Sequence, residues 1–231
     1  HLRQPDSGKH ERGVGCAAIA EMLRSGTTCF AELYFFPDAA AQAMIEARIR
    51  AEICFPILQF PSAWARTEDE YLHKGLQVHD DQRHNELITT AFGPHSPYTV
   101  GDEMLGRIVV LAEELEIPIH IHLHETRQEV EQAVADTGKR PMQRLQELGM
   151  LSPQLQAVHM TQLTPGEIDL LAANSVHVIH CPESNLKLGS GFCPVAELID
   201  RGINVALGTD GAASNNDLDM FEAMRQASFL A

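Results

Sequence analysis

Three histidines stand two residues apart in an apolar stretch, at His120, His122 and His124. Residues 117–124 have the composition of a short β-strand, and strand side chains alternate between two faces. The three imidazoles are therefore expected on one face, where burial is unfavourable unless their lone pairs are used. A metal ion is the simplest group that could bind these lone pairs, because neutral imidazole is its commonest protein ligand. Glu125 follows directly and can carry a proton or add a ligand.

These residues do not all favour the same interpretation. Taken alone, His120 is better explained as a hydrogen-bonded core histidine than as a metal ligand. For His122 with Glu125 we favour a functional role, because polar side chains follow several other strands in the same way.

Strand-like and helix-like segments alternate along the chain with short connections. We expect strands at 27–33, 49–58, 87–92, 117–124, 155–159, 176–180 and 203–209. We expect helices at 14–25, 39–48, 67–81, 101–115, 165–173, 195–201 and 217–230, with one or two more within 127–148. Residues 1–13 are polar and aperiodic, which is typical of a loop. The alternation favours a parallel sheet covered by helices.

Polar residues at the strand ends decide between an open sheet and a barrel. They are Glu32, His95, His122, His159, His180 and Asp210. In a (β/α)8 barrel the carboxyl ends of the strands converge on one mouth, whereas an open sheet would spread these residues along an edge. There is no GxGxxG and no Walker A sequence. We therefore predict an α/β fold, a TIM-type (β/α)8 barrel of the metal-dependent hydrolase kind with about seven of its eight strands.

Three of these strand-end residues form a candidate metal site. His122, His159 and Asp210 offer nitrogen and oxygen ligands that suit zinc or iron(II) and leave room for water. Glu125 beside such a water can shuttle its proton. Two structural alternatives stay open: Asp210 can be a helix N-cap, and His159 a hydrogen-bonded core histidine.

Composition narrows the function classes. The 231 residues carry 17 basic and 32 acidic side chains, a net charge of -15, which disfavours nucleic acid and anionic membranes as partners. No apolar run is long enough to span a bilayer. The five cysteines include no CxxC pair, so we expect reduced, mostly buried thiols, a cytoplasmic location and no cysteine-rich structural zinc site.

The chain resembles the amidohydrolase superfamily, and within it the 5-methylthioadenosine/S-adenosylhomocysteine deaminases. The resemblance begins near residue 14 and runs to the end of the chain. It rests on Gly93-Pro94-His95-Ser96-Pro97-Tyr98, His122-Leu123-His124-Glu125-Thr126, Val158-His159, Ser184-Asn185-Leu186-Lys187-Leu188-Gly189 and Leu207-Gly208-Thr209-Asp210-Gly211-Ala212-Ala213-Ser214-Asn215-Asn216. The motif at residues 207–216 is highly specific for this family, and the occurrence of all the motifs in this order is more specific still.

The resemblance implies a role for each matching residue. His122 and Asp210 match metal ligands, with one divalent ion, zinc or alternatively iron. Glu125 matches the acid/base residue that also contacts the purine, and His159 the histidine that positions the water. Asp210 also matches a catalytic and substrate-binding position.

Other implied contacts lie around this centre. His95 matches a substrate-contacting histidine, and Arg66 corresponds to an arginine that reaches the substrate. Ser184 and Asn185 match a loop motif near the pocket. The implied reaction is hydrolytic deamination of an adenosine-type nucleoside, 5'-methylthioadenosine or S-adenosylhomocysteine, to the inosyl product and ammonia.

Two family features have no counterpart in this chain. The family carries a His-x-His pair after the first barrel strand, and no such pair stands in the first hundred residues here. The family also carries a small β-sandwich, built from both chain ends, which this sequence lacks. We therefore expect a single barrel domain over residues 1–231 that is truncated at both ends, a fragment of a longer protein.

Two alternative functions stay open. One is another amidohydrolase reaction, such as s-triazine chlorohydrolysis or guanine deamination. The other is a non-catalytic barrel that binds a nucleoside. Glu125, three residues after His122, favours deamination, because a leaving amine needs a proton. The expected partner is a small-molecule purine nucleoside, and the sequence leaves a homo-oligomer open.

Overall fold

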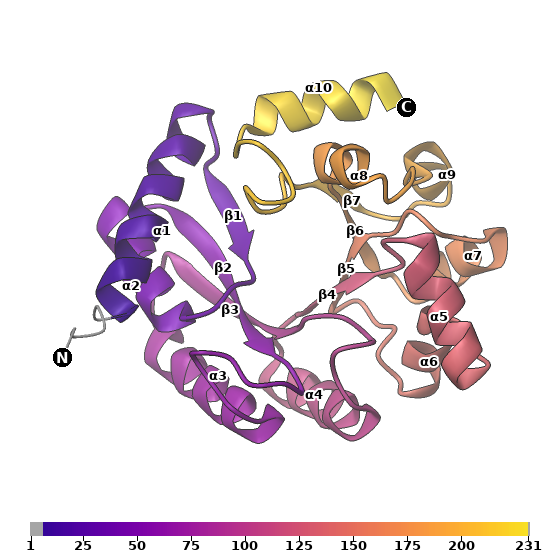
Figure 1. Cartoon of the computed structure of the whole chain (residues 1–231), viewed down its shortest axis with the longest axis horizontal. Helices are drawn as coiled ribbons and strands as arrows, with labels where there is room; N and C mark the ends of the chain where they lie inside the picture. The colour runs from indigo at the N-terminus through magenta and orange to yellow at the C-terminus, as the bar shows by residue number, and fades with distance from the viewer. Residues whose placement is uncertain (1–6, 231) are drawn as a thin grey trace.

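The chain folds around one curled parallel sheet. The structure, a computed structural model, describes residues 7–230. Seven strands follow one another in space in chain order. They are β1 (Cys29–Glu32), β2 (Arg50–Ile57), β3 (Ile88–Pro94), β4 (Ile119–Leu123), β5 (Leu155–His159), β6 (His177–His180) and β7 (Val205–Leu207). Figure 1 shows the strands curving around a common axis with the helices outside, so the predicted barrel-type α/β fold is confirmed.

Helices connect the strands on the outside of the sheet. They are α1 (Ser7–Arg24), α2 (Pro37–Ala47), α3 (Glu68–Gln82), α4 (Asp102–Leu115), α5 (Arg127–Thr137), α6 (Pro141–Glu147), α7 (Pro165–Ala173), α8 (Pro182–Leu188), α9 (Val195–Asp200) and α10 (Met220–Leu230). None of the helices in this described part combines the length and hydropathy needed to cross a bilayer.

Strand pairing aligns the carboxyl ends of the strands at one mouth. The pairing of β4 with β5 places His122 opposite Val158, and Leu123 opposite His159. Within residues 7–230, β1 pairs only with β2 and β7 only with β6. The ring of strands is therefore open between β1 and β7 (Figure 1).

The two faces of β2 show how the sheet divides apolar from polar groups. Ala51 and Ile53 lie in an apolar cluster with Met44 of α2. Because side chains alternate along a strand, Glu52 and Cys54 point to the opposite face, the inside of the curl. The interior therefore contains polar groups, while most apolar contacts lie between sheet and helices.

Threonine side chains cap the first turns of α3 and α7. The Thr67 hydroxyl accepts from the Glu70 amide at 3.2 Å. Thr164 forms a complete capping box with Glu167. Each cap satisfies amides that lack an intrahelical partner, which fixes where the loop leaving the mouth becomes a helix.

Three expectations about segments need correction. Residues 7–13 are helical and belong to α1, where Arg12 pairs with Glu46 of α2 at 3.4 Å; residues 1–6 lie outside the described part. Ser184 and Asn185, expected in a loop motif, lie in helix α8, which begins at a favourable proline. Helix α10 begins at Met220 rather than at residue 217, because the Asp219 carboxylate accepts from the amides of the first turn.

The cysteines are free but less buried than expected. Cys54 and Cys181 are buried and Cys193 is half-buried, whereas Cys16 and Cys29 are exposed. Cys29 is exposed because its strand, β1, is the first of the sheet and has a single paired neighbour among the described residues.

Candidate functional site

His122 stands at the centre of the mouth and its ring is held by one carbonyl. The Nδ1 atom lies 2.7 Å from the backbone oxygen of His95. A carbonyl oxygen only accepts, so Nδ1 carries the proton and Nε2 keeps its lone pair. This is the arrangement in which imidazole binds a metal, with the second nitrogen fixed by an acceptor. The His95 ring itself lies 4.9 Å from that of His122.

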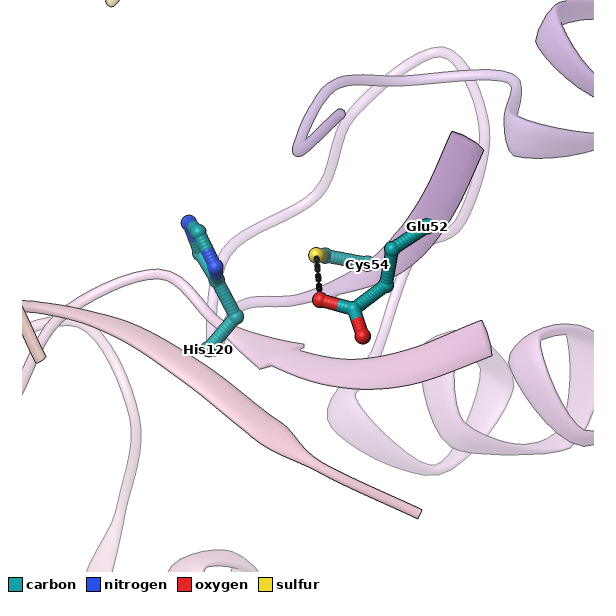
Figure 2. Close-up of side chains that lie close together, drawn as sticks. All are labelled: Glu52, Cys54 and His120. Atoms are coloured by element: carbon teal, nitrogen blue, oxygen red, sulfur yellow. Dashed lines mark hydrogen bonds between the residues drawn. The ribbon is translucent and has the colours of Figure 1, made fainter. Parts of the chain in front are cut away.

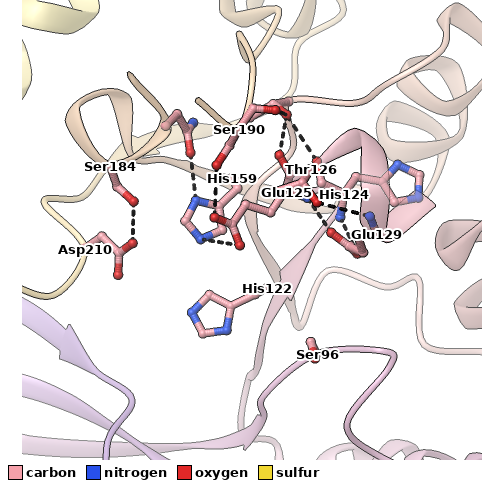
Figure 3. Close-up of polar contacts among 12 residues, drawn as sticks. Ser96, His122, His124, Glu125, Thr126, Glu129, His159, Ser184, Ser190 and Asp210 are labelled. Atoms are coloured by element: carbon pink, nitrogen blue, oxygen red, sulfur yellow. Dashed lines mark hydrogen bonds and ion pairs between the residues drawn. The ribbon is translucent and has the colours of Figure 1, made fainter. Parts of the chain in front are cut away.

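His159 stacks on His122 from the next strand. The ring centroids are 5.4 Å apart and the planes differ by 25°. Nδ1 of His159 lies 3.0 Å from the amide oxygen of Asn185 and therefore donates to it. Its Nε2 faces Glu125, with 3.9 Å between that nitrogen and the Oε2 atom of Glu125. Figure 3 shows these side chains gathered at the strand ends.

Glu125 reaches this group through the loop that follows β4. Ser190 Oγ donates to its Oε1 atom at 3.1 Å. Its backbone is fixed by Glu129, whose two carboxylate oxygens accept from the amides of His124 and Glu125 at 3.0 and 2.7 Å. Sequence reasoning missed Glu129, although Thr126 with a glutamate three residues later is a recognisable capping signal.

Asp210 lies across the mouth from Glu125 (Figure 3). Its Oδ2 atom accepts from the Ser184 hydroxyl at 2.6 Å, and Oδ1 accepts from the Gly211 amide at 2.7 Å. Ser184 is fully buried on α8. Short bonds to both oxygens fix the direction of the carboxylate, and the Ser184 motif therefore contacts the site from a helix.

The backbone at the strand ends is in the left-handed region. The φ angle is 76° at His159, 52° at Met160 and 60° at Asp210. Residues with a Cβ atom rarely adopt this conformation, at a cost of about 1–2 kcal/mol each. Strain of this kind collects where side-chain direction matters more than local stability.

Burial favours the neutral form of His122 and His180. It lowers the pKa of His122 well below the usual range, and the neighbouring His159, His95 and His120 add to the effect. Burial also lowers the pKa of His180, at the end of β6, to about 4. The buried Nδ1 atom of His180 has no hydrogen-bond partner among the described residues. Neutral nitrogens with free lone pairs are the state that a divalent metal requires.

Two predictions about the histidine strand receive different outcomes. His120 is a buried histidine whose Nδ1 lies 2.9 Å from the side-chain oxygen of Gln156, as the core interpretation expects. The expectation that all three histidines share a face is wrong. His124 follows the end of β4 with a φ of 51°, so strand alternation no longer holds there. Its Nε2 accepts from the Met142 amide at 3.1 Å, between the sheet and α6.

Arg66 lies apart from the other predicted site residues. Its side chain is exposed on the loop between β2 and α3. It lines a surface pocket of about 270 Å³ whose other walls include Glu68, Asp69 and Arg107. The structure thus brings together His95, His122, Glu125, His159 and Asp210, but not Arg66.

One group of potential ligands was missed entirely from sequence. Within the described part of the chain, ligand atoms of three His, Cys, Asp or Glu side chains lie within 4.8 Å of one another only at Glu52, Cys54 and His120. His122 and Asp210 are not in such a group. The missed signal was a glutamate and a cysteine two residues apart in an apolar strand, which places both on one face.

Comparison with known proteins gives a consistent set of matches. The sequence profile of the amidohydrolase family matches residues 1–231. A 5-methylthioadenosine/S-adenosylhomocysteine deaminase from Saccharophagus degradans is 59% identical over 92% of this chain and 48% of its own length. A 5'-deoxyadenosine deaminase from Methanothermobacter thermautotrophicus is 42% identical over 94% of this chain and 50% of its own length.

A solved structure agrees with these relatives. The crystal structure of an adenosine deaminase from Xanthomonas campestris with bound zinc superposes with a TM-score of 0.95 at 51% identity. It covers 97% of this chain and 51% of that one. The chain therefore spans about half the length of the curated relatives it matches.

Proposed function

The chain belongs to the amidohydrolase family, and from that premise we propose that it forms the catalytic barrel of a metal-dependent deaminase of adenosine-type nucleosides. The observation that carries the proposal is the convergence of His122, His159 and Glu125 at one mouth, with Asp210 opposite. The substrate class is 5'-methylthioadenosine or S-adenosylhomocysteine, which the name of the relative from S. degradans supports.

His122 and Asp210 would hold the divalent metal, zinc in the first instance and iron(II) as the alternative. The free Nε2 atom of His122 and the fixed carboxylate of Asp210 fit such an ion. When bound, the ion supplies Lewis acidity that lowers the pKa of water toward about 7. His159, with Nδ1 committed to Asn185, can accept a hydrogen bond from the attacking water at Nε2 and so orient it.

Glu125 is assigned the proton transfers. Deamination adds water to the purine carbon that bears the amino group, breaks the carbon–nitrogen bond and releases ammonia. Glu125 takes a proton from the water and gives it to the ring nitrogen. It then takes the remaining proton from the newly added hydroxyl group and transfers it to the departing amine, so that the carbon becomes a carbonyl as ammonia leaves. The hydroxyl of Ser190 holds one carboxylate oxygen, which leaves the other directed toward His159.

The remaining predicted contacts lie around the purine. His95, whose ring packs beside His122, is placed to touch the base or ribose. Arg66 is exposed on the β2–α3 loop, so we restrict its role to the outer substituent of the nucleoside.

The test is ammonia release by the full-length gene product from 5'-methylthioadenosine and S-adenosylhomocysteine. Chloride release from a chlorotriazine and deamination of guanine serve as parallel assays. Turnover of the adenosyl substrates with little activity in the parallel assays is expected. Preferred turnover of a triazine or of guanine contradicts the substrate class, and bound metal without turnover of any of them supports a non-catalytic barrel.

A further inference from the structure

A second group of metal-type ligands lies inside the curl of the sheet. Glu52 and Cys54 come from β2 and His120 comes from β4, two strands separated by β3. Figure 2 shows the three side chains close together, with the thiol of Cys54 against the carboxylate of Glu52 and the His120 ring beside them. One potential ligand atom from each lies within 4.8 Å of the other two. A single ion at this point would link strands that share no backbone hydrogen bond.

Each side chain presents a suitable donor. Nδ1 of His120 lies 2.9 Å from the side-chain oxygen of Gln156, so that nitrogen donates and Nε2 keeps its lone pair. This is the outer contact that orients ligating histidines in metal sites. The Cys54 sulfur is fully buried and lies 3.9 Å from a carboxylate oxygen of Glu52. Sulfur, nitrogen and oxygen together suit a borderline-soft ion such as zinc.

The local charge favours a cation. Burial raises the pKa of Cys54 well above its usual range, and the carboxylates of Glu52 and Glu32 raise it further. Burial raises the pKa of Glu32 to about 7. Neither glutamate takes part in an ion pair among those found between described residues. Burial therefore disfavours the charged forms of these acidic groups, and a bound cation would offset that cost at Glu52 and Cys54, whose ligand atoms lie 3.9 Å apart.

The group is separate from the catalytic mouth. His120 precedes His122 by two residues on the same strand and thus lies deeper in the barrel. The rings of His120 and His122 are 6.3 Å apart and nearly perpendicular. The Nδ1 partner of His122 is the carbonyl of His95, whereas that of His120 is Gln156. The two sites therefore have no ligand side chain in common.

We propose that Glu52, Cys54 and His120 form a second site for a divalent ion of the zinc type, independent of the proposed deaminase function. On binding, the sulfur–hydrogen bond of Cys54 breaks, the proton goes to solvent and the thiolate binds the ion without any change of oxidation state. Three protein ligands leave a fourth position for water. The ion stabilises the folded barrel by tying β2 to β4.

Cobalt(II) distinguishes this site from the catalytic one. Thiolate–cobalt bonds give a charge-transfer absorption in the near ultraviolet, whereas the proposed catalytic ligands, His122 and Asp210, contain no sulfur. The apo form of the full-length gene product is titrated with CoCl2. Two bound ions per chain and one thiolate band are expected. Cobalt that binds without a thiolate band overturns the proposal, whatever any variant does.

Variants assign the band to a residue. Cys54→Ser should abolish the band and remove one ion, while the exposed control Cys16→Ser should leave both unchanged. His122→Ala should remove the other ion and keep the band. A second variant, His120→Gln, covers the case in which Cys54→Ser does not fold. Loss of the band in Cys181→Ser, with the band kept in both Cys54→Ser and His120→Gln, places the thiolate elsewhere and overturns the proposal.

Discussion

The carbonyl oxygen of His95 accepts two hydrogen bonds from His122, one from its backbone amide at 3.1 Å and one from its Nδ1 atom at 2.7 Å. Both donors belong to one residue, so strand pairing and ring direction are set together. The ring cannot flip without losing its bond to the carbonyl of His95, the residue that follows β3. Nε2 is thereby held toward the mouth.

This arrangement predicts the effect of removing the ligands. His122→Ala or Asp210→Ala in the full-length protein should each lose one metal ion per chain, because a site with one ligand fewer binds a divalent ion weakly. Elemental analysis after gel filtration measures the loss. His73→Ala, which alters an exposed histidine of α3, is the control. A full metal complement in both variants would show that His122 and Asp210 are not the metal ligands.

Glu125→Gln should preserve shape and hydrogen bonding while removing the titrating group. General acid–base catalysis contributes about 10²–10⁴-fold, so kcat should fall by about that factor. Metal content and melting temperature should stay unchanged. All three quantities are measured on one preparation. A variant with kcat within about threefold of the parent takes Glu125 out of the mechanism.

Glu129→Gln should disturb Glu125 without touching substrate. The amide group replaces one of two oxygens that accept from consecutive backbone amides, which costs about 1.5–3 kcal/mol for a charged hydrogen bond. We expect kcat to fall about tenfold or more with KM little changed. Glu131→Gln, exposed on the same helix, is the matched control. Equal kinetics in the two variants contradicts a positioning role for Glu129.

Gly191→Ala tests the contact between Ser190 and Glu125. Gly191 has a φ of 136°, and a Cβ atom there would lie 2.4 Å from Gln162 Nε2 and 2.8 Å from Thr161 Oγ1. The loop must then move and carry the Ser190 hydroxyl away from Glu125, so lower kcat is expected. Gly166→Ala, at a helical glycine with open space, should be neutral. The measurement is kcat of both variants on the same substrate. An unchanged kcat in Gly191→Ala would contradict a role for the contact between Ser190 and Glu125.

Stability should fall in acid because of His124. Its Nε2 accepts from the Met142 amide, so protonation there breaks a buried hydrogen bond. Burial, reinforced by Arg140 and opposed by Glu167, lowers the pKa of His124 to about 4. The unfolded chain binds this proton at about pH 6.5. The stabilisation is therefore complete above about pH 6.5 and is lost as the pH falls toward 4, a decrease on the order of 1–3 kcal/mol.

Denaturant titration of metal-free protein at several pH values measures this slope. His124→Gln keeps an acceptor for the Met142 amide but does not titrate, so its curve should be flatter. His84→Gln changes an exposed histidine and should follow the parent. Parallel slopes for the parent and His124→Gln would assign the acid sensitivity to other groups.

The seven strands could be predicted because short apolar runs between turn signals are a local property of sequence. The Thr164–Glu167 capping box and the polar residues at strand ends are equally local. The direction of His124 could not be predicted, since it depends on a left-handed φ at the point where strand alternation stops. The exposed position of Arg66 could not be predicted for a related reason, because its loop has no repeating pattern of apolar and polar residues.

Long-range contacts explain the other omissions. The contact from Ser190 to Glu125 joins residues 65 positions apart. In the sequence, Glu52 and Cys54 are only two polar residues within an apolar strand. The curvature of the sheet places His120 near them, and no sequence pattern indicates that contact. Contacts of this kind depend on the three-dimensional arrangement of the strands and produce no periodic pattern in the sequence.

The opening between β1 and β7 has a consequence for assembly. Each of these strands has one unpaired side within the described residues (Figure 1). A segment that fills the opening and completes the parallel order must bring its carboxyl end to the mouth beside Asp210. It needs no peptide bond to the rest, since hydrogen bonds to both edges would hold it. The barrel is thus suited to split-protein complementation, in which a peptide added in trans is detected by the thermal shift it produces.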